Sequence, residues 1–181
     1  MGQLGALVLD ADQTAHEVLA DPEVIASLTD WWGDWVLGSD GQVDRARVAQ
    51  VVFEDSEQRR RLENLIHPRV FARWAETLQR CRAEPGFASA VVIDAPLLFE
   101  CGLDGECDVI VFVDVPEEIR ARRVQERRGW SLAELRRREK MQKSLDIKRD
   151  RADHIVENNS SVSDLRRKAE NAFTAITSSG R

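Results

Sequence analysis

Two short apolar segments that end in carboxylates constrain this chain more than any other feature. The first is Leu7-Val-Leu-Asp-Ala-Asp12, and the second is Val91-Val-Ile-Asp-Ala-Pro-Leu-Leu-Phe-Glu100. Such apolar runs are typical of buried strands in a parallel sheet, and the acidic residues that follow them lie at its open end. The pattern predicts chemistry on a charged, metal-bound substrate.

The rest of the chain alternates between expected strands and expected helices. Strands are predicted at 7–9, 90–93, 109–113 and 154–156. The 109–113 segment is apolar on both faces, so it is expected to be buried inside a parallel sheet. Apolar residues at spacings of three and four predict helices after Asp12, from Asp44, over 62–78 and over 165–176. A capping-box pattern of Ser131 and Glu134 predicts a further helix that begins at Leu132. Pro68 is expected to split the 62–78 region into two helices, because proline cannot donate a hydrogen bond in a helix interior. This alternation predicts an α/β domain with a parallel sheet.

Composition excludes several classes of protein. The chain has 181 residues and a net charge of −6, which suits a single domain and argues against nucleic acid as a partner. Its three cysteines form no CxxC pair, so we expect neither a zinc site nor a disulfide framework. A reducing cytoplasm fits this cysteine usage. No apolar run approaches the length needed to cross a membrane, so no membrane partner is expected.

Positive charge is concentrated in one stretch, residues 117–151, which holds half of the 26 lysines and arginines. Two interpretations compete for it. A run of charges is usually a solvated helix surface laced with ion pairs. The alternative is a mobile lid whose arginines close over phosphates.

Taken together, the motifs resemble those of the dephospho-CoA kinase family, and the match covers nearly the whole chain. The order and spacing of the fragments carry this resemblance. They are Val8-Leu-Asp-Ala-Asp12, Ala15-His-Glu-Val18, Asp40-Gly41, Asp44-Arg45, Val52-Phe53, Leu65-Ile-His-Pro68, Asp94-Ala-Pro-Leu-Leu-Phe-Glu100, Gly102-Leu103, Val113-Asp-Val-Pro116, Arg127 before Gly129, Arg138 with Gln142, Ala152-Asp153 and Glu157-Asn158.

The resemblance implies a three-layer P-loop kinase-type fold, with a parallel sheet, a helical coenzyme A subdomain and a lid. Residues 1–181 would form a single domain, with 14–85 as a mainly helical acceptor-binding region and 117–151 as the basic lid. The implied reaction is ATP-dependent phosphorylation of the ribose 3′-hydroxyl of dephospho-coenzyme A, the last step of coenzyme A biosynthesis. The implied partners are ATP with Mg²⁺ and dephospho-coenzyme A.

Within this resemblance, three carboxylates have expected roles. Asp12 is the candidate base or orienting group for the acceptor hydroxyl. The alternative for Asp12 is a helix N-cap, because a helix follows it directly. Asp10 and Asp94 are expected on the substrate side. Asp94 could also hold Mg²⁺ through water, and its alternative is a turn at the strand end.

The remaining candidate residues lie in the lid and at two element ends. Arg127 and Arg138 are the lid arginines expected at the phosphates, whereas Arg122, Arg123, Arg136 and Arg137 are expected to be solvated. Arg127 and Asn158 are expected at the donor nucleotide, although Asn at a strand end is often a turn former. His67 is expected on the acceptor side, with packing or capping as its alternative. The Trp31-Trp32-Gly-Asp-Trp35 cluster is most simply packing, although one ring could stack on an acceptor base.

The chain departs from the family pattern at its start. P-loop kinases open with a strand, a Gly-rich loop that ends in Gly-Lys-Ser or Gly-Lys-Thr, and a helix. No Gly-Lys pair occurs among the 181 residues. The missing segment would be roughly 20 to 25 residues long and would supply the central strand.

The expected explanation is a start codon assigned too late, with the loop encoded upstream of Met1. The chain as written is expected to fold weakly and to be inactive. Two other functions stay open: a non-catalytic coenzyme A-binding pseudokinase, and another P-loop kinase acting on a nucleotide or small molecule.

Overall fold

The computed structural model describes residues 1–84 and 86–179, and its contacts divide the chain into two compact units. The N-terminal unit is Ala6–Ala95. The C-terminal unit combines Met1–Gly5 with Pro96–Arg181. Among the described helices, none is both long enough and apolar enough to span a lipid bilayer.

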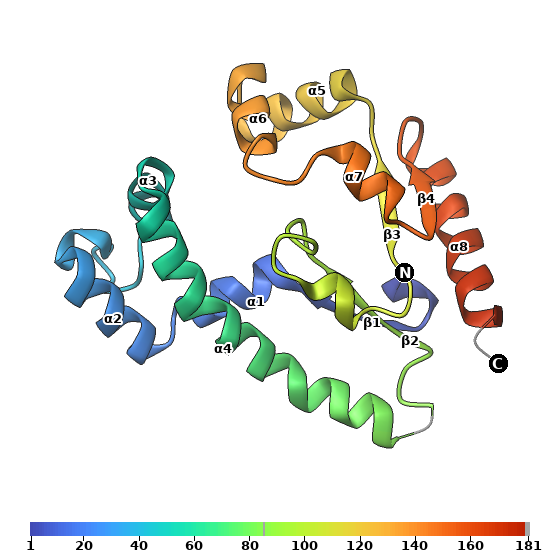
Figure 1. Cartoon of the computed structure of the whole chain (residues 1–181), viewed down its shortest axis with the longest axis horizontal. Helices are drawn as coiled ribbons and strands as arrows, with labels where there is room; N and C mark the ends of the chain where they lie inside the picture. The colour runs from blue at the N-terminus through green and yellow to red at the C-terminus, as the bar shows by residue number, and fades with distance from the viewer. Residues whose placement is uncertain (85, 180–181) are drawn as a thin grey trace. The chain divides into compact units, whose positions relative to one another are not determined.

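The N-terminal unit is a two-stranded parallel sheet with four α-helices and one 3₁₀ helix (Figure 1). Its elements are β1 (Ala6–Asp10), α1 (Ala11–Val18), α2 (Pro22–Trp32), the 3₁₀ helix η2 (Asp34–Val36), α3 (Arg45–Glu54), α4 (Ser56–Ala83) and β2 (Ala90–Asp94). Three aspartates begin helices here, because their carboxylates accept backbone N–H groups that would otherwise lack partners. They are Asp10 for α1, Asp44 for α3 and Asp55 for α4.

The core of this unit lies among its helices. Four apolar side chains are fully buried: Val18, Val24, Leu28 and Val36. The helix α4 contributes Ile66, Val70 and Trp74 to the core, at the spacing of four that keeps side chains on one face. This confirms the predicted buried face of the long helical region. Both α1 and α3 pack against α4 (Figure 1).

The predicted break at Pro68 is wrong, because α4 runs without interruption from Ser56 to Ala83. Pro68 is exposed, so its ring lies on the solvent side of the helix. It cannot donate to the carbonyl of Asn64, four residues earlier. One turn of the helix is supported by a side chain instead, since Arg69 Nη1 donates to the carbonyl of Leu65 at 3.0 Å. Packing of the flanking residues Ile66 and Val70 outweighs the missing backbone bond.

The C-terminal unit contains a second two-stranded parallel sheet, β3–β4. Its described elements are η1 (Gly2–Leu4), η3 (Leu103–Glu106), β3 (Val111–Asp114), α5 (Glu117–Arg128), α6 (Leu132–Glu139), α7 (Leu145–Asp150), β4 (His154–Glu157) and α8 (Val162–Ser179). The predicted capping of the helix at Leu132 is confirmed, since Ser131 Oγ accepts from the backbone N–H of Glu134. In Figure 1, α8 lies beside β4, and the two elements are in contact.

Strand β3 differs from its prediction in bounds and in burial. It runs from Val111 to Asp114, and just before the ladder Asp153 Oδ2 accepts the N–H of Ile110 at 2.8 Å. We expected both faces of this strand to be buried, yet Val113 is 51% exposed. On the neighbouring strand, Ile155 is 48% exposed. A sheet of only two strands covers too little surface to bury the apolar side chains of both its faces.

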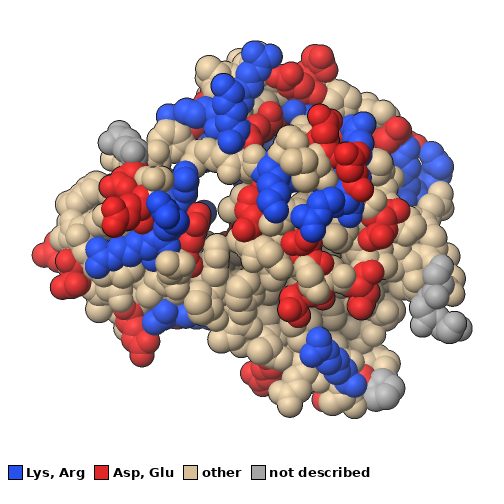
Figure 2. Space-filling model, viewed as in Figure 1, with Lys and Arg blue, Asp and Glu red and all other residues tan. Residues whose placement is uncertain are grey.

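Each described sheet has two strands, and no ladder joins β2 to β3 among the described residues. A strand with a single neighbour leaves one row of its N–H and C=O groups outside the ladder. The predicted parallel pairing is confirmed within each sheet. Basic and acidic side chains are intermixed on the face shown in Figure 2.

Replacing Pro68 with alanine should stabilise the chain. Pro68→Ala restores the donor to the Asn64 carbonyl and should raise the free energy of unfolding by about 1–3 kcal/mol. Pro22→Ala is the matched control, because Pro22 stands in the first turn of α2, where no intrahelical bond is lost. Urea unfolding followed by far-ultraviolet circular dichroism measures both. A lower stability for Pro68→Ala would show that the proline itself holds α4 in place.

Candidate active site

Two carboxylates lie side by side at the carboxyl end of the β1–β2 sheet. The strands pair in register from Ala6↔Ala90 to Asp10↔Asp94, so the last residue of each strand faces the other. Adjacent strands are about 4.8 Å apart, and residues in register project from the same face. Both carboxylates are exposed. Sites in open parallel sheets form at this end of the strands, as the sequence predicts for Asp10 and Asp94.

The structure separates the roles of Asp10 and Asp12. Asp10 is the N-cap of α1, because its Oδ1 accepts from the backbone N–H of Gln13 at 2.8 Å. Asp12 lies in the first turn of α1, is exposed, and caps nothing. The capping role that was the alternative for Asp12 therefore belongs to Asp10. Asp12 is left as a carboxylate at a helix N-terminus that is open to a ligand.

A relay of hydrogen bonds fixes the junction between β1 and α1, and sequence reasoning missed it. Thr14 Oγ1 donates to the carbonyl of Asp10 at 2.7 Å. The same hydroxyl accepts from Trp74 Nε1 of α4 at 3.0 Å. Trp74 is only 4% exposed, so the relay is anchored in the core. A threonine four residues after a strand-end carbonyl is a recognisable pattern, but its tryptophan partner is 60 residues away.

His67 lies inside α4 and not at a helix junction. Its ring centroid is 6.4 Å from that of Phe71, and the Phe71 centroid is 6.1 Å from that of Trp74. These three rings follow one another along α4 at spacings of four and three. The geometry of the row favours the packing alternative for His67. Contact with the acceptor stays a prediction.

The tryptophan cluster also packs mainly on α4. The Trp31 ring lies under the guanidinium of Arg61, with 3.9 Å between Cζ and the ring centroid. Trp32 Nε1 donates to Gln58 Oε1 at 2.9 Å. Trp35 is 48% exposed, so it is the ring of the cluster with the most surface open to a ligand.

Ion pairs occupy many of the arginines in the basic stretch. Arg120 Nε lies 2.8 Å from Glu139 Oε1, and Arg136 Nε lies 2.7 Å from Glu117 Oε1. Hydrogen bonding and attraction by Arg136 hold the pKa of Glu117 below its ordinary value. These pairs join α5 to α6 and match the predicted solvated surface laced with ion pairs.

The two arginines predicted at the phosphates have different surroundings. Arg127 lies in the last turn of α5, is exposed, and forms no ion pair among the described residues. Arg138 lies at the end of α6, and its Nε donates to Glu134 Oε1 at 2.7 Å. Burial opposes ionisation of Glu134, yet hydrogen bonds from Arg138 and Arg137 hold its pKa below the ordinary value.

A buried polar cluster ties the loop after β2 to the lid. Lys148 is 7% exposed, and its Nζ donates to the Pro96 carbonyl at 2.9 Å and to Gln142 Oε1 at 2.8 Å. The same Nζ lies 3.2 Å from Glu100 Oε1, which also accepts the backbone N–H of Lys143 at 2.6 Å. A buried lysine must be paired in this way to remain charged. Glu100 and Lys148 therefore hold the loop and the lid helices together within the C-terminal unit.

Asn158 follows β4 directly and extends its pairing, since its N–H donates to the Asp114 carbonyl at 2.7 Å. The residue is half-buried at the carboxyl end of the β3–β4 sheet. Its proximity to a donor nucleotide stays a prediction.

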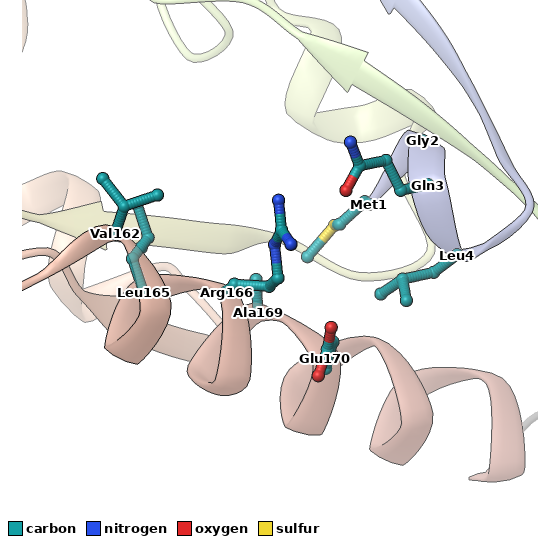
Figure 3. Close-up of a pocket in the computed structure, with 9 residues that line it drawn as sticks. All are labelled: Met1, Gly2, Gln3, Leu4, Val162, Leu165, Arg166, Ala169 and Glu170. Carbon is teal, nitrogen blue, oxygen red and sulfur yellow. The ribbon is translucent and has the colours of Figure 1, made fainter.

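A pocket of about 320 Å³ lies elsewhere in the C-terminal unit, between the first residues of the chain and α8 (Figure 3). None of the predicted site residues lines it. The lining consists of Met1, Gly2, Gln3, Leu4, Val162, Leu165, Arg166, Ala169 and Glu170. Apolar side chains dominate it, and we assign no chemistry to this pocket.

The residues that suit a metal are the strand-end carboxylates. Among the described residues, no cluster of three or more His, Cys, Asp or Glu side chains could hold a metal ion. Mg²⁺ does not require such a cluster, because it is usually held by one or two carboxylates together with substrate phosphates and water. The exposed Asp94 carboxylate fits that mode of binding.

Comparisons with known proteins agree with this geometry. A family model described as dephospho-CoA kinase matches residues 1–164. A dephospho-CoA kinase of Corynebacterium glutamicum is 37% identical over 175 residues, which cover 96% of this chain and 86% of that protein. The dephospho-CoA kinase of Thermobifida fusca is 37% identical over 162 residues, covering 89% of this chain and 79% of that protein.

Solved structures give the same result. A crystal structure from Thermus thermophilus has a TM-score of 0.78 and 33% identity, covering 96% of this chain and 86% of that one. The dephospho-CoA kinase from Campylobacter jejuni has a TM-score of 0.70 and 25% identity, covering 99% and 89%. These likenesses confirm the predicted α/β fold of the P-loop kinase type.

The separation of Asp10 from Asp12 can be tested by stability. Asp10→Ala removes the cap of α1 and should lower the free energy of unfolding by about 1 kcal/mol. Asp12→Ala removes no hydrogen bond and should cost roughly 0.5 kcal/mol or less. Both are measured by urea unfolding, with Asp10→Asn as a control that retains an acceptor. Equal losses for the two alanine variants would contradict the assignment of the cap.

Proposed function

This chain belongs to the dephospho-CoA kinase family, and from that premise we propose that it is built to phosphorylate the ribose 3′-hydroxyl of dephospho-coenzyme A, with ATP as the donor. The observation that carries the proposal is the exposed Asp12 carboxylate. It follows a strand end at which Asp10 and Asp94 lie in register. Phosphoryl transfer needs a positioned carboxylate beside the attacking hydroxyl.

In the proposed reaction, Asp12 orients the 3′-hydroxyl and takes its proton as the oxygen attacks the γ-phosphorus of ATP. A new O–P bond forms, the bond to the bridging oxygen breaks, and ADP leaves. The relay from Trp74 through Thr14 to the Asp10 carbonyl keeps the strand–helix junction rigid, which holds Asp12 in place.

Charge on the transferred group is neutralised from the lid. In this proposal Arg138 and Arg127 approach the phosphates, where a guanidinium can donate two parallel hydrogen bonds. Mg²⁺ carried by the nucleotide fits Asp94 as a ligand through water, and it would neutralise charge on the phosphate oxygens. Asn158 lies at the donor nucleotide and His67 on the acceptor side.

The 181 residues contain no recognisable loop that would bind the phosphates of the donor. P-loop enzymes hold them with a Gly-rich loop and its lysine, and no Gly-Lys pair occurs in the 181 residues. We propose that the chain by itself transfers phosphate very slowly or not at all. We also propose a cytoplasmic location, since none of its three cysteines forms a disulfide.

A pair of chains tests the function. One is the 181-residue chain, and the other carries at its N-terminus the strand, Gly-Lys-Ser loop and helix of a dephospho-CoA kinase. With ATP, Mg²⁺ and dephospho-coenzyme A, the extended chain should form coenzyme A, whereas the shorter chain should only bind the acceptor. Acceptor binding without turnover in both chains would favour a non-catalytic coenzyme A-binding protein. Faster phosphorylation of a nucleoside monophosphate would reveal a different kinase.

Asp12→Asn in the extended chain tests the proposed base. Asparagine keeps the size of the side chain but cannot take the proton, so turnover should fall by about 10²-fold or more while the KM for ATP changes little. Arg136→Ala is the control, because Arg136 pairs with Glu117 and has no proposed role in the reaction. Near-normal turnover in Asp12→Asn would move the search for the base to Asp10 or Asp94.

A further inference from the structure

Two guanidinium groups of the lid lie over the indole ring of Trp130. The Cζ of Arg138 is 4.1 Å from the centroid of the ring, and that of Arg128 is 5.0 Å from it. A guanidinium over a tryptophan face is attracted by the negative face of the ring. The turn that carries Trp130 begins at Gly129, the left-handed C-cap of α5, and ends at Ser131, the N-cap of α6.

The Arg138 guanidinium is held at two places. Its Cζ lies over the Trp130 ring, and its Nε donates to Glu134 Oε1 at 2.7 Å. No described residue accepts a hydrogen bond from its terminal groups, Nη1 and Nη2. A guanidinium held by an aromatic ring and by its Nε presents its two terminal groups, Nη1 and Nη2, as a preoriented fork. That fork matches two oxygens of one phosphate.

Neighbouring arginines of α6 are held differently. Arg137 directs Nη2, one of its terminal groups, to Glu134 Oε2 at 2.5 Å. Arg136 directs Nε to Glu117, and no aromatic ring holds its face among the described residues. Arg136 is also more exposed than Arg138, at 59% against 42% of the side chain. Arg136 and Arg138 both pair through Nε and keep their terminal groups outside any described hydrogen bond, and Arg138 differs from Arg136 by lying over the Trp130 ring.

We propose that Trp130 is a positioning residue of the lid, which holds the Arg138 guanidinium so that its Nη edge binds the polyphosphate chain of the donor nucleotide. This inference rests on the proposed function for the identity of the donor. The stack limits rotation about the long arginine side chain, so less conformational entropy is lost when the phosphate binds. Glu134 sets the direction of the fork by accepting from Nε.

Tripolyphosphate, the inorganic analogue of the ATP phosphates, tests the proposal on the 181-residue chain. Its binding is followed by NMR of the arginine side-chain Nε–Hε and Nη–Hη groups. Ring currents of Trp130 should displace the Arg138 signals in the unbound chain. Addition of tripolyphosphate should then shift the Nη signals of Arg138 more than those of Arg136.

Variants distinguish the positioning of Arg138 by Trp130 from the general effect of positive charge on α6. Trp130→Leu should weaken tripolyphosphate binding by about three- to tenfold, and Trp130→Phe should restore much of the loss because a ring face is retained. Arg138→Ala should weaken binding more than Arg136→Ala, although both remove one positive charge from the same helix. Trp35→Leu, which changes an exposed tryptophan of the other unit, should have no effect.

Three results would overturn the proposal. They are an Arg138 signal without a ring-current shift, equal losses in Arg136→Ala and Arg138→Ala, and the absence of saturable tripolyphosphate binding. If Trp130→Leu weakens binding and its Arg120–Glu139 signals are unchanged, the loss is not due to unfolding of the lid. The coenzyme A assay is independent of these measurements, so failure of the proposed reaction and failure of this inference can be told apart.

Discussion

The parallel register of β1 and β2 is the constraint on which the candidate site depends. Because the two strands pair without stagger, the last residue of one, Asp10, faces the last residue of the other, Asp94. Helix α1 begins at the next residue, with the Asp10 side chain as its cap, so no loop intervenes. Asp12 is consequently placed within one helical turn of the strand ends. A shift of register by one residue would move one of the facing carboxylates to the opposite face of the sheet.

Packing then makes this arrangement rigid. The Thr14 hydroxyl joins the Asp10 carbonyl to the buried indole of Trp74, and so the strand end is tied to the long helix α4. Arg73 joins the same helix to the end of α1 and to the residue before α2, through Glu17 and Asp21. Surface ion pairs of this kind contribute little each, so the buried indole is the stronger anchor. A catalytic carboxylate benefits from such support, because small displacements reduce the rate steeply.

In the lid, ion pairs determine which arginines of the positively charged stretch are available to bind an anion. Residues 117–151 carry a large excess of positive charge, yet acidic residues on α5 and α6 engage Arg120, Arg136 and Arg137. Arg149 and Arg151 pair with carboxylates outside the run, Asp114 and Asp104. A guanidinium that is already engaged in an ion pair can bind phosphate only through the N–H groups that the pair leaves open. Affinity for anions is therefore set by how each arginine is held, and not by their number.

Much of the fold could be read from the sequence. Apolar runs that end in acidic residues gave the positions of β1 and β2, and the family motifs indicated the P-loop kinase type of fold. These features are local, because strand and helix periodicities repeat within a few residues. The unbroken course of α4 through Pro68 was not predicted, since its stability comes from side chains that pack against other helices.

In the candidate site as well, local features could be predicted from the sequence and contacts between side chains could not. The identity of the candidate residues was available from motif spacing, and their roles remain predictions. The sequence pattern offered capping as an alternative for Asp12 alone, whereas the structure gives the cap to Asp10, because its carboxylate is the one that reaches the N–H of Gln13. The sequence pattern also gave no sign of Trp74 beside Thr14, or of Trp130 beneath Arg138. The first contact joins side chains on two different helices, and the second depends on the turn between α5 and α6, so the geometry of both exists only in the folded chain.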